Sequence, residues 1–157
     1  MTHERWKPNV TVATVIENEG KYLLVYEQPK GNVTEGTNKA VYNQPAGHLD
    51  EGESLIAAAE RETLEETAWE VSVSYYLGLY RYIAPNGITY LRHGFVAQAN
   101  KHHPARMLDK GIIDAVWMSY KEICLNSSQM RSPMVKQLID DYRSGQLYSL
   151  AVIHEDR

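Results

Sequence analysis

Three glutamates gather within the segment "RETLEET", namely Glu62, Glu65 and Glu66. At 100° per residue they fall on one face of a helix, near its C-terminal end. There the helix dipole disfavours each carboxylate by roughly 0.3–1 kcal/mol, and the like charges at positions 62 and 66 cost a further ~0.2–0.5 kcal/mol. The segment is therefore either a solvated, charge-rich helix or a site that holds a cation.

The residues before this helix favour the cation site. Residues 43–54, "NQPAGHLDEGES", are rich in proline and glycine, so their backbone can bend close to the helix and offer carbonyl groups to a ligand. Carboxylate oxygens suit Mg²⁺, with Mn²⁺ as the alternative, and a bound ion removes the repulsion among the acids. The combination predicts a divalent cation site.

The other faces of the helix have separate expected roles. Glu53 and Arg61 are eight residues apart, or two turns, so they can pair with each other without using up the other three acids. Leu64 and Ala57 point roughly opposite the acids, where we expect a sheet to cover them.

The elements that must position these acids alternate between strands and helices. Residues 10–18 and 21–28 are β-branched or apolar and are joined by turn residues, which predicts a hairpin. Residues 29–40 contain three breakers and no periodicity, so a loop leads into the acidic segment. The first helix then opens at residues 53–54 and runs to about Thr67.

The second half of the chain continues this alternation. Strands are expected over 70–83, 89–99 and 113–119, a turn at 85–87, an exposed loop over 100–111 and a short helix over 120–126. Ser132 and Pro133 open the last helix, and Gly145 ends it. These elements predict one α/β domain over all 157 residues, with helices on the faces of a mixed sheet.

Composition limits the partners and the compartment. A net charge of -4 gives no general attraction for nucleic acid or anionic membranes, so an anionic ligand must be met by a metal or by a few placed cations. No apolar run is long enough to span a membrane. The single cysteine, Cys124, excludes an intramolecular disulfide and favours the cytoplasm, and we expect it to be a buried thiol and not a nucleophile.

The spacing of the acidic segment matches a known signature. Gly47, five residues, Glu53, seven residues, Arg61-Glu62, two residues and Glu65-Glu66 strongly resemble the Nudix box. Two positions depart from that pattern: Thr63 occupies a usually aliphatic position, and Ala68 replaces the usual glycine. The first departure is tolerable for a β-branched residue, and the second bears on where the helix ends.

The resemblance implies both a fold and a set of roles. It implies an α/β/α Nudix sandwich that hydrolyses a nucleoside diphosphate linked to another group, with Mg²⁺ as cofactor. Glu62, Glu65 and Glu66 then become the metal ligands and catalytic residues, and the carbonyl of Gly47 becomes a further ligand. Glu53 and Arg61 become a structural pair.

Similarity to the family continues outside the box. "KPNVTVA", "NQPAGHL", "YIAP", "LR", "RSP" and "YRSGQLY" resemble a bacterial phosphatase branch of the Nudix family. This resemblance implies action on nucleoside tri- and diphosphates and on the pyrimidine pyrophosphate of thiamine synthesis. The partner is then a small nucleotide or pyrophosphate, whereas the oligomeric state stays open.

Several residues outside the box are candidates for substrate contacts. Arg92 and Arg81 lie in strands and either contact a phosphate or are outward-facing charges. Tyr42 and Trp6 either stack on a base or pack against the protein.

Two acids outside the helix are candidates for proton transfer. Asp109 and Asp114 precede the strand that contains Trp117, and either could be an additional acid near the metal. A loop position or a strand start explains each of them equally well. The general base is therefore one of the helix glutamates or one of these two aspartates.

Two rival functions deserve a test. Pro85, sixteen residues after Trp69, resembles a proline of the ADP-ribose pyrophosphatases of the Nudix family. A nucleotide-binding regulator without hydrolytic activity is the other alternative, but loss of a catalytic glutamate would be its mark, and all three are present.

Overall fold

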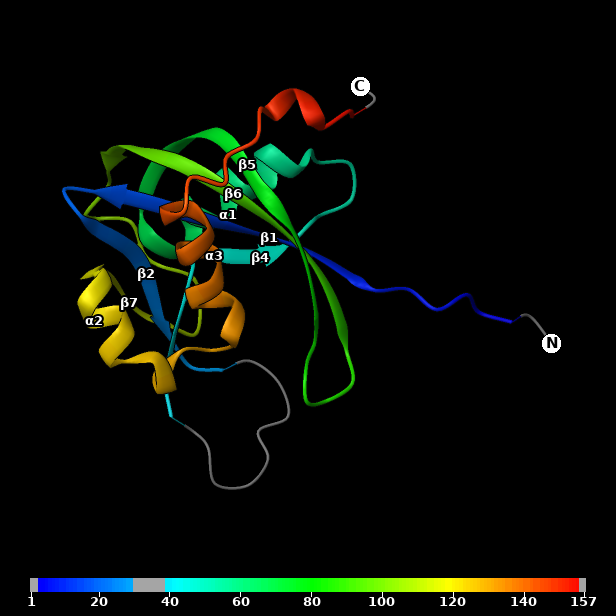
Figure 1. The fold of residues 1–157 in the computed structure, drawn as a ribbon, viewed down its shortest axis with the longest axis horizontal. Coiled ribbons are helices and arrows are strands. Elements are labelled where there is room, and N and C mark those ends of the chain that lie inside the picture. Colours follow the sequence, from blue (N-terminus) through cyan, green and yellow to red (C-terminus); the bar gives the residue numbers. More distant parts are fainter. Residues whose placement is uncertain (1–2, 30–38, 156–157) are drawn as a thin grey trace.

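The computed structural model describes residues 3–29 and 39–155, so the loop expected over 29–40 falls largely outside the described residues. The strands are β1 (Asn9–Asn18), β2 (Lys21–Glu27), β3 (Val41–Asn43), β4 (Ala46–His48), β5 (Trp69–Ile83), β6 (Thr89–His102) and β7 (Ile112–Ser119). The helices are α1 (Leu55–Thr67), α2 (Tyr120–Leu125) and α3 (Pro133–Arg143), with 3-10 turns at η1 (Ser127–Gln129) and η2 (Leu150–Val152). Figure 1 shows their arrangement.

The strands form one mixed sheet in the order β3-β2-β1-β6-β5, with β4 paired to β1 and β7 paired to β2. β1 runs parallel to β6 along most of its length. On its other edge β1 pairs with β4 at residues 11–13 and with β2 only at residues 17–18. The sheet therefore splits along β1, and β4 brings the segment before α1 against the first half of that strand.

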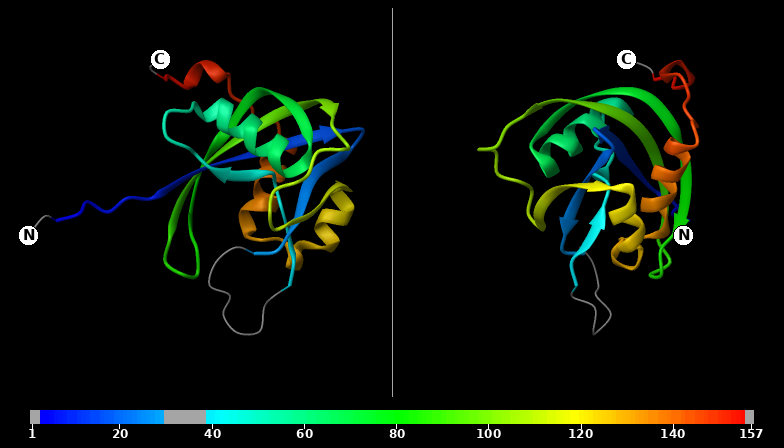
Figure 2. Two further views of the ribbon diagram at one scale, coloured as in Figure 1. Left: turned by 180° about the vertical axis from the view of Figure 1, so that it is seen from behind. Right: turned by 60° about the vertical axis from the view of Figure 1, so that its left-hand side comes forward.

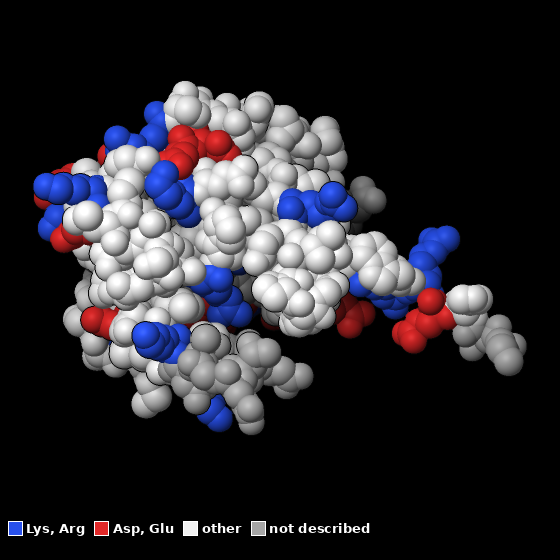
Figure 3. All heavy atoms as spheres, turned by 60° about the horizontal axis from the view of Figure 1, so that its bottom comes forward, with Lys and Arg blue, Asp and Glu red and all other residues white. Residues whose placement is uncertain are grey.

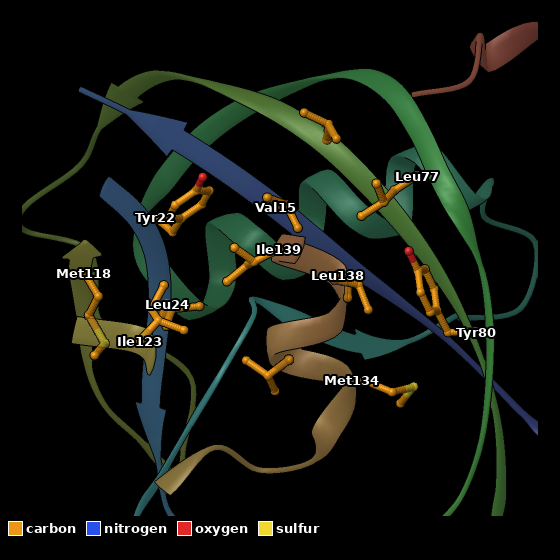
Figure 4. Packing of buried hydrophobic residues seen from close by; sticks show 13 residues of the cluster. Val15, Tyr22, Leu24, Leu77, Tyr80, Met118, Ile123, Met134, Leu138 and Ile139 are labelled. Atoms are coloured by element: carbon orange, nitrogen blue, oxygen red, sulfur yellow. The ribbon is translucent and has the colours of Figure 1, made fainter. Parts of the chain in front are cut away.

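Helices cover both faces of the sheet, as the sequence predicted. On one face α3 packs Leu138 and Ile139 against Val15 and Leu77 (Figure 4). On the other face α1 lies against the sheet, and Figure 2 shows α1 and α3 on opposite sides of β1. The mixed α/β sandwich is confirmed.

The face by which α1 meets the sheet differs from the expectation. Ala58, Ala59 and Thr63 are fully buried, whereas Ala57 is exposed and Leu64 is only half-buried. Small side chains let the helix approach the sheet closely, and the hydroxyl groups of Thr63 and Thr14 form a 2.7 Å hydrogen bond across the contact. The expectation that Ala57 and Leu64 face the sheet is wrong. The side of α1 that packs on the sheet is the one with small side chains, and not the one that contains the larger apolar Leu64.

The end of β6 and the burial of Cys124 both differ from the expectation. β6 extends to His102, three residues beyond the expected strand, because β5 pairs with it as far as Trp69. Cys124 is half-buried, so the expectation of a buried thiol is wrong; its neighbour Ile123 is the side chain of α2 that enters the core. Among the described helices, none is long and apolar enough to cross a membrane.

Candidate active site

The segment between β4 and α1 fixes where the acidic helix begins. Ser54 is the N-cap, and its hydroxyl accepts a 3.0 Å hydrogen bond from the Ala57 N–H. The Glu53 carboxylate accepts a 2.9 Å hydrogen bond from the Asp50 N–H, which closes the preceding turn. Such capping satisfies backbone donors that a helix start otherwise leaves unpaired. The start of α1 is therefore fixed relative to β4, and with it the position of the acids along the helix.

Arg61 and Glu53 form a forked ion pair. Nη2 of Arg61 donates to Oε1 of Glu53 at 2.6 Å, and Nε donates to Oε2 at 3.0 Å. The hydrogen bonds from Arg61 lower the pKa of Glu53 below its ordinary value. The guanidinium also donates to the backbone oxygen of His48 at 3.1 Å, so it ties α1 to β4.

Besides Glu53, Arg61 engages two of the other three acids. Its Nη1 donates to Glu62 Oε1 at 2.9 Å and to Glu65 Oε2 at 3.1 Å. A guanidinium presents donors on several edges, so one arginine can serve the pairing partner and two further carboxylates at once. Part of the repulsion inferred for the acidic helix end is therefore relieved by the protein itself.

Glu62, Glu65 and Asp109 form a cluster of oxygen ligands. Each offers a carboxylate oxygen, and these atoms lie within 4.8 Å of one another. The loop that contains Asp109 is held there because its N–H donates to the backbone oxygen of Glu65 at 3.0 Å. Burial raises the pKa of Glu62 above its ordinary value, and the negative charges of Glu65 and Asp109 add to this. Clustered hard oxygens with an excess of negative charge fit a divalent cation.

Gly47 approaches this cluster more closely than any other residue type could. A Cβ atom added to Gly47 would lie 2.1 Å from the carboxyl carbon of Glu62. The absence of a side chain at position 47 therefore lets the β4 backbone and the Glu62 carboxylate occupy neighbouring positions, as joint ligation of one ion requires.

Glu66 is not one of these three clustered side chains, but it lies beside the same strand, β4. Its side chain is 5% exposed, and Oε1 accepts a 2.8 Å hydrogen bond from the Ala46 N–H. Of the three glutamates expected to share one site, two lie beside Asp109, and Glu66 binds the β4 backbone next to Gly47. The difference follows from the burial of the Ala58, Ala59 and Thr63 face, on which Glu66 also lies.

The two candidate arginines lie on opposite faces of the β5–β6 hairpin. Arg92 pairs in register with Tyr80, so Arg81, one residue further along β5, points to the other face. Arg92 is 9% exposed, and the alternative that it is an outward-facing charge is wrong. Arg81 is exposed.

The remaining candidates are spread over the molecule. Tyr42 packs on Tyr26, with 4.8 Å between ring centroids, and Trp6 is 70% exposed near the N-terminus. Asp114 is exposed in β7, where its side chain accepts a hydrogen bond from the Ala115 N–H. The structure thus brings Asp109, but not Asp114, to the helix acids.

Sequence reasoning missed a second polar group near Arg92. Glu27 is 5% exposed, and its Oε1 accepts hydrogen bonds from Arg131 at 2.9 Å and from Asn43 at 3.3 Å. No spacing pattern signals this group, because Glu27 and Arg131 are 104 positions apart. Only a polar residue at the end of an apolar strand, such as Glu27 in "KYLLVYE", offered a hint.

Comparisons with known proteins agree with this geometry. Residues 6–139 match the NUDIX domain family. The chain is 40% identical over 148 residues to the phosphatase NudJ of Escherichia coli K12 and to that of Shigella flexneri, which covers 94% of this chain and 92% of each relative. A solved NUDIX hydrolase from Nitrosomonas europaea is 44% identical, with a TM-score of 0.89 over 96% of this chain and 98% of that chain.

Proposed function

Because the chain belongs to the NUDIX domain family of hydrolases, which act on phosphoric anhydride bonds, we propose that its substrates are nucleoside tri- and diphosphates and related pyrophosphates. The pyrimidine pyrophosphate of thiamine synthesis is included in this proposal, through the likeness to the phosphatase NudJ. The observation that carries it is the cluster of Glu62, Glu65 and Asp109 beside the side-chain-free Gly47.

We assign a divalent cation, Mg²⁺ with Mn²⁺ as a substitute, to the acids of this site. Glu62 and Glu65 would hold it together with Glu66 and the carbonyl of Gly47, and Asp109 is the additional acid that the fold supplies. When bound, such an ion neutralises charge on the phosphates and makes water more acidic. The net charge of the chain gives no other general means of attracting an anionic substrate.

The chain's own residues then have distinct tasks in hydrolysis. A carboxylate of the cluster accepts a proton from water as the water oxygen bonds to phosphorus and the bond to the bridging oxygen breaks. Asp109 is suited to this task, because it comes from a loop and adds a carboxylate beyond those of α1. Glu53 and Arg61 keep α1 fixed to β4 and so keep the glutamates in register with Gly47.

A substrate panel tests the proposal. Purified protein with Mg²⁺ is assayed against nucleoside tri- and diphosphates, ADP-ribose, dinucleoside polyphosphates and the thiamine-precursor pyrophosphate, and the inorganic product is identified. Orthophosphate as the sole inorganic product supports phosphatase action on these substrates, whereas pyrophosphate indicates cleavage at the inner phosphate. Turnover of ADP-ribose alone would replace this proposal by the ADP-ribose alternative, and no turnover would favour a binding role.

The same proposal includes the binding partner and the cellular compartment of the enzyme. A small molecule is its partner, with neither nucleic acid nor membrane, and the cytoplasm is its compartment, because a single cysteine forms no intramolecular disulfide.

A further inference from the structure

Arg92 is a buried cation whose hydrogen-bonding capacity is largely unused. In the part of the chain that the structure describes, its buried Nε and Nη1 atoms have no hydrogen-bond partner. Burial, followed by the positive charge of Arg131, lowers the pKa of Arg92 to about 10. A guanidinium out of water without partners is strongly disfavoured, so its retention here requires a reason.

The neighbouring carboxylate does not relieve Arg92. The Oε1 atom of Glu27 accepts hydrogen bonds from Arg131 and Asn43, and Glu27 accepts none from Nε or Nη1 of Arg92. The backbone of Arg131 is also held in place, because its N–H donates to the backbone oxygen of Tyr42 at 2.8 Å. The ion pair between Glu27 and Arg131 therefore leaves the Nε and Nη1 atoms of Arg92 without a hydrogen-bond partner within the described residues.

A further polar atom beside Arg92 also lacks a partner. Thr11 pairs in register with Arg92 in the neighbouring strand, and its buried hydroxyl makes no hydrogen bond within the described residues. The charges of Glu27 and Glu66 act on Arg92, so the arginine lies within electrostatic range of the proposed catalytic acids. The space-filling view of Figure 3 shows Lys or Arg atoms, coloured blue, in a recess near the middle of the face that it draws.

An anion fits this arrangement better than a neutral group does. A phosphate accepts hydrogen bonds from a guanidinium in a forked geometry and balances its positive charge, and a hydroxyl donor such as that of Thr11 can add a further hydrogen bond. Water would satisfy the donors of Arg92 but, being neutral, would not balance the charge of its buried guanidinium.

We propose that Arg92, supported by Arg131, binds a phosphate group of the substrate that the acids of α1 do not hold. This proposal rests on the hydrolase function above and adds to it the residues that select a polyphosphate over a monophosphate ester. Arg92 is the direct contact. Arg131, held by Glu27, provides the second positive charge.

The test separates a binding role from a structural one. Arg92→Met keeps the length and apolar volume of the side chain but removes the charge, and Arg92→Lys keeps the charge but not the fork. Lys101→Met, in an exposed position of the same strand, is the charge-matched control. For each protein we would measure KM and kcat with Mg²⁺, the melting temperature, and its shift on adding inorganic pyrophosphate in EDTA.

The expected result has three parts. Arg92→Met raises KM for the best substrate at least tenfold and loses the pyrophosphate shift, yet melts no lower than wild type, because an unpartnered buried charge has been replaced by an apolar side chain. Arg92→Lys recovers part of the affinity. Lys101→Met behaves as wild type.

Contrary results are equally definite. A melting temperature lowered in Arg92→Met with KM and the pyrophosphate shift unchanged would show that Arg92 is structural. If Arg92→Met does not fold, unchanged KM in Arg92→Lys overturns the proposal. Wild-type protein that shows the pyrophosphate shift but hydrolyses none of the panel refutes the proposed function and leaves the subsite standing.

Discussion

The backbone of Gly47 and the carboxylate of Glu62 lie so close together that a Cβ at position 47 would fall 2.1 Å from the carboxyl carbon of Glu62. Gly47 belongs to β4 and pairs with Val12, so the sheet fixes its position. Glu62 belongs to α1, and its carboxylate is the mobile end of a long side chain. A clash between them must therefore move the carboxylate and not the strand.

This relationship predicts that Gly47→Ala separates activity from stability. Displacing the Glu62 carboxylate should lower kcat/KM by roughly 10²-fold or more, since a misplaced catalytic group costs about that much. Unfolding free energy should change by less than about 1 kcal/mol, because a flexible side chain can give way. The measurements are steady-state kinetics and urea unfolding. Gly47→Ala combined with Glu62→Gln should be no less active than the worse single variant, and additive losses would contradict a shared cause.

Arg61→Lys should lose both stability and activity. Lysine cannot reproduce the fork that joins Arg61 to Glu53, and hydrogen bonds to charged groups are worth about 1.5–3 kcal/mol when partly buried. Urea unfolding of Arg61→Lys, Glu53→Gln and the double variant tests this, with the double variant expected to be less destabilised than the sum. Unchanged stability in Arg61→Lys would make a substrate contact the better explanation of this arginine.

The raised pKa of Glu62 gives the metal-free protein a specific pH dependence. Between the ordinary value of 4.5 and the higher folded value, the folded chain holds a proton that the unfolded chain releases, so this group's contribution to stability falls as pH rises. In EDTA, the difference in stability by which Glu62→Gln exceeds wild type should therefore increase as the pH rises from 4.5. It should become constant above the folded pKa of Glu62. Melting curves across this range measure it. Glu51→Gln, at an exposed turn, is the control, and a pH-independent difference contradicts the prediction.

Position 68 tests how α1 ends. Ala68 adopts the left-handed conformation, with φ of 60°, and its N–H donates to the Leu64 oxygen. Ala68→Gly relieves roughly 1–2 kcal/mol of strain but removes a buried methyl group worth about 0.8 kcal/mol, so a gain of up to about 1 kcal/mol is expected. The gain should be the same with Mg²⁺ and with EDTA. Ala68→Val should destabilise, because branching at Cβ disfavours this conformation, and a stable valine variant would contradict the assignment.

The sequence by itself determined whatever depends on near neighbours in the chain. The spacing of Gly47, Glu53 and the acids of α1 identified the family, and the cap at Ser54 and the left-handed end at Ala68 are local properties of backbone and side chain. A helix has one period, so residues that share a helix can be placed relative to one another from their numbers alone.

Only the tertiary structure decided which of these side chains meet residues from elsewhere. Asp109 joins Glu62 and Glu65 because its loop is bonded to the end of α1, and Asp114 does not. Arg92 is buried beside a pair whose members are 104 positions apart. Burial depends on which strands and helices pack over a residue, and packing over such separations leaves no periodic trace in the sequence. The sequence therefore showed the acidic helix and named Arg92 as a candidate, but only the tertiary structure showed that Arg92 is buried.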